Sequence, residues 1–99
     1  MSLANFTERV KTIVRANTIS DAKVKFELDE GVVHVDATQQ PNIVNNEDKE
    51  ADCVIKMSLE NANKLLDGEL NVMSAVMFGK IKIKGDMGVA MKVAQMVTK

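Results

Sequence analysis

The stretch LNVMSAVMFGKIKIKGD, residues 70–86, joins two different hydrophobic patterns. Its first half is apolar on nearly every side, because Asn71 and Ser74 are its only polar residues, and a helix of this kind has to be covered all round. Its second half alternates lysine with isoleucine, which predicts a strand with Ile81 and Ile83 facing inward. The function of the chain therefore depends on what covers the helix: the rest of the protein, a second copy or a ligand.

The composition is that of one small domain, residues 1–99, with 13 Lys and Arg against 14 Asp and Glu and a formal net charge of −1. Without an excess of positive charge, binding to nucleic acid is not expected. The single cysteine excludes an internal disulfide, and no zinc-binding pattern occurs. No apolar run reaches the roughly 20 residues that span a bilayer, and the N-terminus has no secretory signal pattern. We therefore expect a cytoplasmic protein.

The remaining periodicities predict an α+β fold. Helices are expected at 3–14, 59–67 and 87–98, strands at 23–28, 32–38 and 51–57, and a short edge strand at Ile43 and Val44. The first two strands are separated by Asp29, Glu30 and Gly31, a turn that predicts an antiparallel hairpin. The strands form an antiparallel or mixed sheet of about five strands, with about four or five helices on its apolar face.

Catalytic residues are not expected. The only histidine, His34, falls in the water-facing phase of its strand with Asp36, whereas Cys53 falls in the inward phase as a buried thiol. Neither has the partner that a nucleophile or a general base needs. The sequence around Gly79 and Lys80 lacks the spacing of a phosphate-binding loop. We therefore expect no enzymatic activity, no metal and no cofactor.

The last predicted helix is apolar over most of its circumference. Its polar stripe consists of Lys92, Gln95 and Lys99 alone, so one face can rest on the sheet while further apolar surface needs a second neighbour. Residues 70–78, a lipid chain or another subunit would each serve. The chain also has seven Met and no Trp or Tyr. Methionines suit a surface that repacks around variable shapes, and they also serve as core filler.

The second half of the chain has a long, ordered set of residues that is typical of one family. The set comprises ADCVIKM at 51–57, Leu65, Leu66, Gly68, Leu70, Ala75, GKIKIKGDM at 79–87, Ala90 and Met91. It resembles the sterol carrier protein type 2 domain, the SCP-2 sterol transfer family. The resemblance implies a five-stranded sheet, covered by helices on one face, that encloses an apolar tunnel for fatty acids, acyl-CoA esters, sterols or phospholipids. Family members often carry a polar residue just before the glycine that matches Gly79, where this chain has Phe78.

We therefore expect noncatalytic binding and transfer of a lipid between the sheet and the helices. The expected lining residues are Leu66, Leu70, Met73, Val76, Met77, Phe78, Ile81, Ile83, Met87, Met91 and Ala94. An empty site would be costly, so it should hold lipid, hold water, or collapse through its methionines (Met73, Met77, Met87, Met91). The expected partner is the lipid, with transient contact with a membrane surface, and the chain should be a monomer or a weak homodimer. Two alternatives stay open: an apolar interaction or dimerisation module, and an accessory subunit of a lipid-metabolising enzyme.

Overall fold

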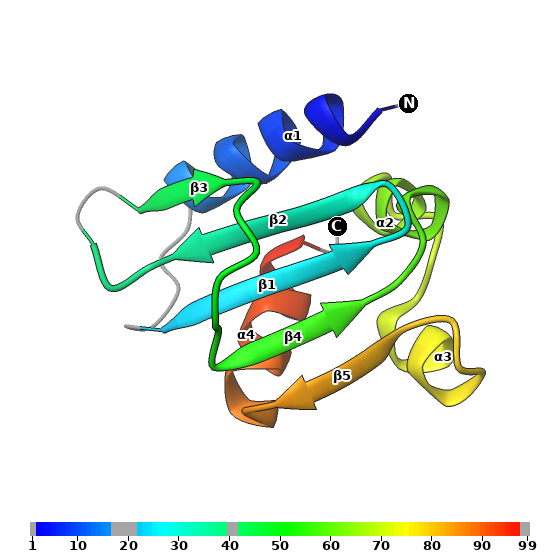
Figure 1. Ribbon diagram of the computed structural model, residues 1–99. Coiled ribbons are helices and arrows are strands. Elements are labelled where there is room, and N and C mark those ends of the chain that lie inside the picture. The colour runs from blue at the N-terminus through cyan, green and yellow to red at the C-terminus, as the bar shows by residue number, and fades with distance from the viewer. Residues whose placement is uncertain (1, 17–21, 40–41, 98–99) are drawn as a thin grey trace.

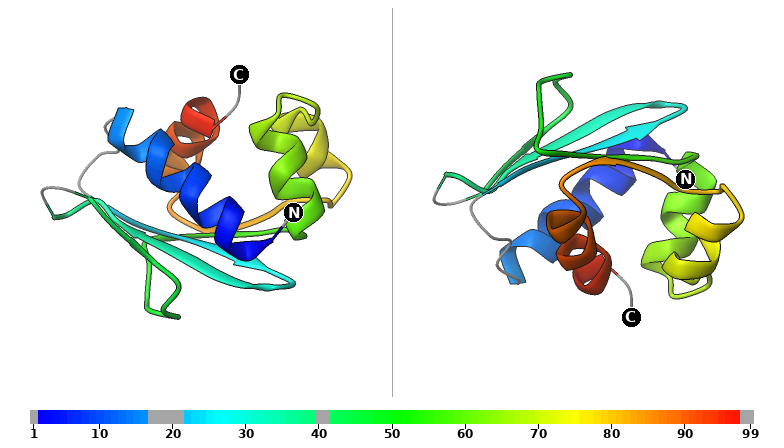
Figure 2. Two further views of the ribbon diagram at one scale, coloured as in Figure 1. Left: turned by 90° about the horizontal axis from the view of Figure 1, so that it is seen from above. Right: turned by 90° about the horizontal axis from the view of Figure 1, so that it is seen from below.

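A computed structural model describes residues 2–16, 22–39 and 42–97, and it confirms the predicted α+β fold (Figure 1). The strands are β1 (Lys23–Leu28), β2 (Gly31–Asp36), β3 (Ile43–Asn45), β4 (Cys53–Lys56) and β5 (Lys82–Gly85), and the helices are α1 (Leu3–Ala16), α2 (Leu59–Leu66), α3 (Val72–Met77) and α4 (Met87–Val97). All four helices lie on one face of the sheet (Figure 2).

The sheet is mixed, with the strand order β3-β2-β1-β4-β5. The predicted hairpin pairs β1 with β2, β1 and β4 run parallel, and the other neighbours are antiparallel. The register places Val33, Phe26, Ile55 and Ile83 in one row across the four strands β2, β1, β4 and β5. This row lies on the inner, helix-covered face because side chains alternate along each strand.

The predicted helix starts are confirmed, and each uses a side-chain oxygen to satisfy a free backbone N–H group. The Ser58 hydroxyl accepts a hydrogen bond from Asn61 N at 3.1 Å at the start of α2. Asn71 accepts from Ser74 N at the start of α3, and the Asp86 carboxylate accepts from Val89 N at the start of α4, each at 3.1 Å.

The hydrophobic core lies between the inner face of the sheet and the helices. Phe6 of α1 and Phe26 of β1 meet edge to face with their ring centroids 5.8 Å apart, a favourable arrangement for two aromatic rings. Val10 and Val14 continue the buried face of α1, and the thiol of Cys53 is buried as predicted. Among the described residues no helix is long and apolar enough to cross a membrane.

His34 lies on the outer face of the sheet as predicted, but the expectation that it is exposed to water is wrong. Only 2% of the residue is exposed, because the segment between β3 and β4 crosses the face opposite the helices (Figure 2, left). His34 Nε2 is 2.9 Å from the carbonyl oxygen of Glu50, and Lys25 forms an ion pair with Asp48 of the same segment at 2.8 Å. The period-two pattern gave the direction of the side chain, and a loop distant in sequence covers it.

Candidate functional site

Over the sheet, α1 and α4 lie toward one side of the helical layer and α2 and α3 toward the other in both views of Figure 2. An apolar cavity of about 20 Å³ lies between the sheet and the helices α2, α3 and α4. Its lining comprises Phe26, Ile55, Met57, Leu65, Val72, Ile81, Ile83, Ala90 and Val93. We call this region the seam. A gap this small has room for about one water molecule and offers it no hydrogen-bond partner. A hydrocarbon chain enters the seam only if the elements around it separate.

Two of the residues predicted to line a lipid site, Ile81 and Ile83, border the seam. Leu66 is buried and Leu70 is partly buried in the surrounding core. Six others are exposed to solvent: Met73, Val76, Met77, Phe78, Met87 and Met91. The side chain of the last predicted residue, Ala94, lies outside the described residues, as does Thr98 at the predicted end of α4.

Sequence reasoning missed several lining residues, although the signal for them was present. Ala90 and Val93 are three residues apart on α4 and therefore share one face of that helix. Phe26 and Ile55 are register partners in the inward phase of β1 and β4. Met77 and Phe78 are predicted as lining residues because they belong to the apolar segment 70–78, whereas from this segment Val72 borders the seam.

Much of helix α3 is left uncovered by the rest of the described chain. Met77 is 80% exposed and Phe78 is 76% exposed, while Ala75 is the buried residue of the helix. Within the described residues the rest of the protein therefore does not cover this helix on every side, and a second copy or a ligand stays as the expected cover. The seam is closed by its own lining residues and not by the four methionines predicted to collapse into it, because Met73, Met77, Met87 and Met91 are all exposed.

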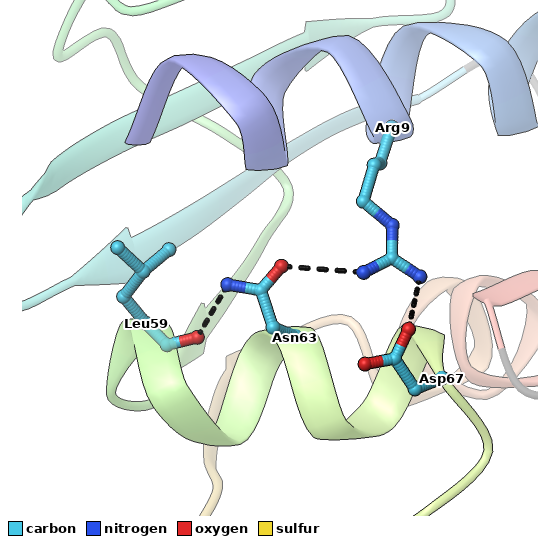
Figure 3. A network of polar contacts seen from close by, with 4 residues as sticks. All are labelled: Arg9, Leu59, Asn63 and Asp67. Atoms are coloured by element: carbon cyan, nitrogen blue, oxygen red, sulfur yellow. Dashed lines mark hydrogen bonds and ion pairs between the residues drawn. The ribbon is translucent and has the colours of Figure 1, made fainter. Parts of the chain in front are cut away.

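Helix α2, in contrast, is held by polar contacts (Figure 3). The guanidinium of Arg9 on α1 donates to Asp67 Oδ1 at 2.6 Å and to Asn63 Oδ1 at 3.4 Å. The amide nitrogen of Asn63, which is buried, donates in turn to the carbonyl oxygen of Leu59 at 3.1 Å. These contacts attach α2 to α1 as well as to the core.

Helix α3 lacks comparable anchoring among the described residues, where its contact with the core runs through Val72 and Ala75. Glycines with positive φ lie on both sides of it, Gly68 at +78° and Gly79 at +74°. Glycine adopts this backbone conformation without the steric cost that a side chain imposes. Among the described residues, α3 is therefore held by fewer contacts than α2.

The buried thiol of Cys53 has a strongly raised pKa. Burial, together with the negative charges of Asp86 and Asp52, raises the pKa of the Cys53 thiol to about 11. The thiol therefore stays protonated at neutral pH, and it is not an activated nucleophile. Within residues 2–16, 22–39 and 42–97, no group of three His, Cys, Asp or Glu side chains has a metal-binding arrangement.

The comparison with protein families is decisive for the classification. The SCP-2 sterol transfer family matches residues 8–98. The chain belongs to this family. Among curated SCP-2 proteins, human sterol carrier protein 2 is 45% identical over 51 residues, a segment that covers 52% of this chain and 9% of the human protein. This chain thus matches only a small part of the length of that relative.

Solved structures of other SCP-2 proteins share the fold. The solution structure of palmitated SCP2L2 from Aedes aegypti has a TM-score of 0.75 at 24% identity, covering 100% of this chain and 96% of the mosquito chain. Sterol carrier protein 2 from Yarrowia lipolytica, in its apo form, has a TM-score of 0.69 at 21% identity, covering 93% of this chain and 73% of the yeast chain. At these identities the likeness concerns the fold alone.

Proposed function

We propose that residues 1–99 form one lipid-binding unit that binds and transfers a lipid without catalysing a reaction, with the hydrocarbon chain held in the seam. Membership of the SCP-2 sterol transfer family supports lipid binding and transfer in general. The observation that carries the proposed location is the wholly apolar seam beside a helix whose large side chains face solvent. Because the mosquito neighbour is described as palmitated, palmitate is the first ligand to test.

Entry of the chain requires α3 to move away from the sheet. Its interface consists mainly of Ala75 and part of Val72, so separation exposes one small and one medium side chain. Fully exposing a valine costs about 1.5–3 kcal/mol. A chain of about 15 methylenes contributes roughly 12 kcal/mol of gross burial, from which association and ordering subtract several. Lipid entry is therefore favourable even after α3 has been displaced.

The exposed side chains at the end of α3 then cover the bound hydrocarbon chain. When α3 turns about Gly68 and Gly79, Met77 and Phe78 lie against the hydrocarbon chain and shield it from water. Methionine side chains adapt to irregular apolar shapes, which suits a ligand of variable length. These residues are thus proposed to contact the ligand only in the bound state.

Thermal unfolding with palmitate and mass spectrometry of a solvent extract test this proposal. Palmitate should raise the melting temperature, and freshly purified protein should release fatty acid or another lipid on extraction. Phe78→Asp should abolish the thermal shift, whereas Lys82→Glu, on the outer face, should leave it nearly unchanged. Absence of both extracted lipid and thermal shift, or equal effects of the two substitutions, would contradict the proposal.

The exposed methionines of α4 support a second candidate, an interface with another copy of the chain. Met87 is 54% exposed and Met91 is 42% exposed. Light scattering distinguishes the two functions. A stable dimer that is indifferent to palmitate favours the interface, and a monomer whose melting temperature rises with the length of the fatty acid favours the seam.

A further inference from the structure

The C-terminal end of α3 combines exposed apolar side chains with nearby lysines. Met73 is 63%, Met77 80% and Phe78 76% exposed, and Figure 1 places α3 at the end of the molecule where β5 begins. Single exposed apolar residues are common on protein surfaces, whereas a contiguous group marks a site of interaction. The chemistry of the neighbouring residues decides which kind of partner fits this end.

Three lysines line an open groove of about 320 Å³ next to Gly79. Lys80 follows the glycine, and Lys56 of β4 lies opposite Lys82 of β5 in the sheet register. Glu27 and Asp29 also border the groove. The Asp29 carboxylate accepts a hydrogen bond from the backbone N–H of Leu59 at 2.7 Å, so it is already engaged at the start of α2.

These lysines differ from most others in the described part of the chain. Lysines in ion pairs with a nearby carboxylate are Lys11, Lys25, Lys49 and Lys64. Within the described ranges, Lys56, Lys80 and Lys82 form no such pair. Residues 70–85 carry three lysines and no acidic residue, although the whole chain has a net charge of −1. Positive charge is therefore concentrated next to the exposed apolar side chains.

This combination matches an anionic lipid surface better than a second copy of the chain. Apolar side chains enter the boundary between headgroups and acyl chains, and adjacent lysines lie at the level of the lipid phosphates. In a two-fold symmetric dimer formed through the same end, the lysines of each copy would face those of the other. Like-charge repulsion opposes such a dimer, while the negative charge of a membrane favours docking.

From this arrangement we infer that the end formed by Met77, Phe78, Lys56, Lys80 and Lys82 docks on anionic membranes. Docking needs no lipid in the seam, so it stands independently of the proposed ligand site. It also brings the more weakly anchored helix, α3, to the lipid surface.

Co-sedimentation with vesicles tests the docking surface. The intact chain should bind vesicles of phosphatidylcholine containing phosphatidylserine at low salt and lose binding at about 500 mM salt, where charges are screened. It should bind pure phosphatidylcholine vesicles at least tenfold more weakly. Equal binding to both vesicle types, or binding that is insensitive to salt, would overturn the inference.

Matched substitutions locate the surface. Met77→Ser with Phe78→Ser should weaken vesicle binding at least tenfold, whereas Ile43→Ser should change it less than twofold, because Ile43, 46% exposed, lies on β3 at the opposite edge of the sheet. Lys80→Gln with Lys82→Gln should weaken binding about 25-fold, or about fivefold per lysine. Lys11→Gln with Lys49→Gln should change it less than twofold. Equal losses in test and control variants would overturn the inference.

Two further measurements distinguish membrane docking from lipid binding in the seam and from dimerisation. The Lys80→Gln, Lys82→Gln variant should still show the thermal shift with palmitate in solution, because neither residue borders the seam. Loss of vesicle binding with an intact palmitate response supports docking as a separate property. Sedimentation velocity that shows a dimer dissociated by Phe78→Ser, together with absent vesicle binding, would overturn docking in favour of a second copy.

Discussion

Arg9 of α1 and Asp67, which follows α2, form an ion pair of 2.6 Å across 58 positions of sequence. The two side chains are 36% and 39% exposed, so solvent screens much of their attraction. The same guanidinium also reaches the amide oxygen of the buried Asn63. Arg9 therefore stabilises α2 less through its ion pair with Asp67 than by donating a hydrogen bond to the amide oxygen of the buried Asn63.

Arg9→Met should lower the free energy of unfolding by about 1–2 kcal/mol, because it leaves the Asn63 oxygen without its donor. Lys11→Met removes the partner of Glu8 on the same helix and should cost less than about 0.5 kcal/mol. Urea unfolding of the two variants measures the difference. If both variants lose the same free energy of unfolding, the contact between Arg9 and Asn63 contributes nothing to stability.

Gly85 lies where a side chain cannot be accommodated. Its φ is +94°, and a Cβ atom there would overlap the carbonyl oxygen of Asp52, which accepts a hydrogen bond from Asp86 N at 2.8 Å. Gly85→Ala should therefore lower the free energy of unfolding by about 3 kcal/mol, because the left-handed backbone and the clash act together. Gly79→Ala is the matched control, because its φ is +74° and no atom lies within 4 Å of the added methyl group.

The Gly79→Ala control should lower the free energy of unfolding by only about 1 kcal/mol, which is the penalty for a left-handed backbone alone. Thermal or urea unfolding of both variants provides the comparison. A Gly85→Ala variant as stable as Gly79→Ala would mean that β4 and the start of α4 can separate without loss of stability.

The buried thiol of Cys53 predicts a pH dependence of stability. Its pKa is raised to about 11 by burial and by the charges of Asp86 and Asp52. Below about pH 8.5 the thiol is protonated in both the folded and unfolded states, so its contribution to stability is complete. As the pH rises from there toward 11, the unfolded state ionises first, and the stability falls.

Over this range the free energy of unfolding should fall by about 2 kcal/mol more in the parent chain than in Cys53→Ala. The variant serves as the control because the lysines titrate alike in both proteins. Parallel pH profiles would contradict the raised pKa.

The sequence predicts the strands and the helix starts well because local interactions decide them. Ser58, Asn71 and Asp86 cap their helices through residues three positions away. The alternation of lysine and isoleucine likewise predicts that Ile83 faces inward, and Ile83 packs against the core. These features need no knowledge of distant contacts.

Exposure and the closure of the site depend on contacts that periodicity does not contain. His34 is buried because the chain near Glu50 crosses it, and Phe78 is exposed because no part of the described chain covers its side chain. The apolar character of α3 could be read from the sequence, but whether protein, lipid or membrane covers it depends on the assembled structure. That is why, of the predicted lining residues whose side chains are described, Ile81 and Ile83 alone border the seam.

Contacts between palmitate and isoleucine methyl groups test the central claim most directly. In NMR spectra of protein with labelled isoleucine methyl groups, nuclear Overhauser effects should join the acyl chain to Ile55 and Ile81, which are 6% and 2% exposed without ligand, and not to Ile43 on β3. Nuclear Overhauser effects that are confined to surface methyl groups, or that are absent at Ile55 and Ile81 when palmitate is bound, would show that the acyl chain does not enter the seam.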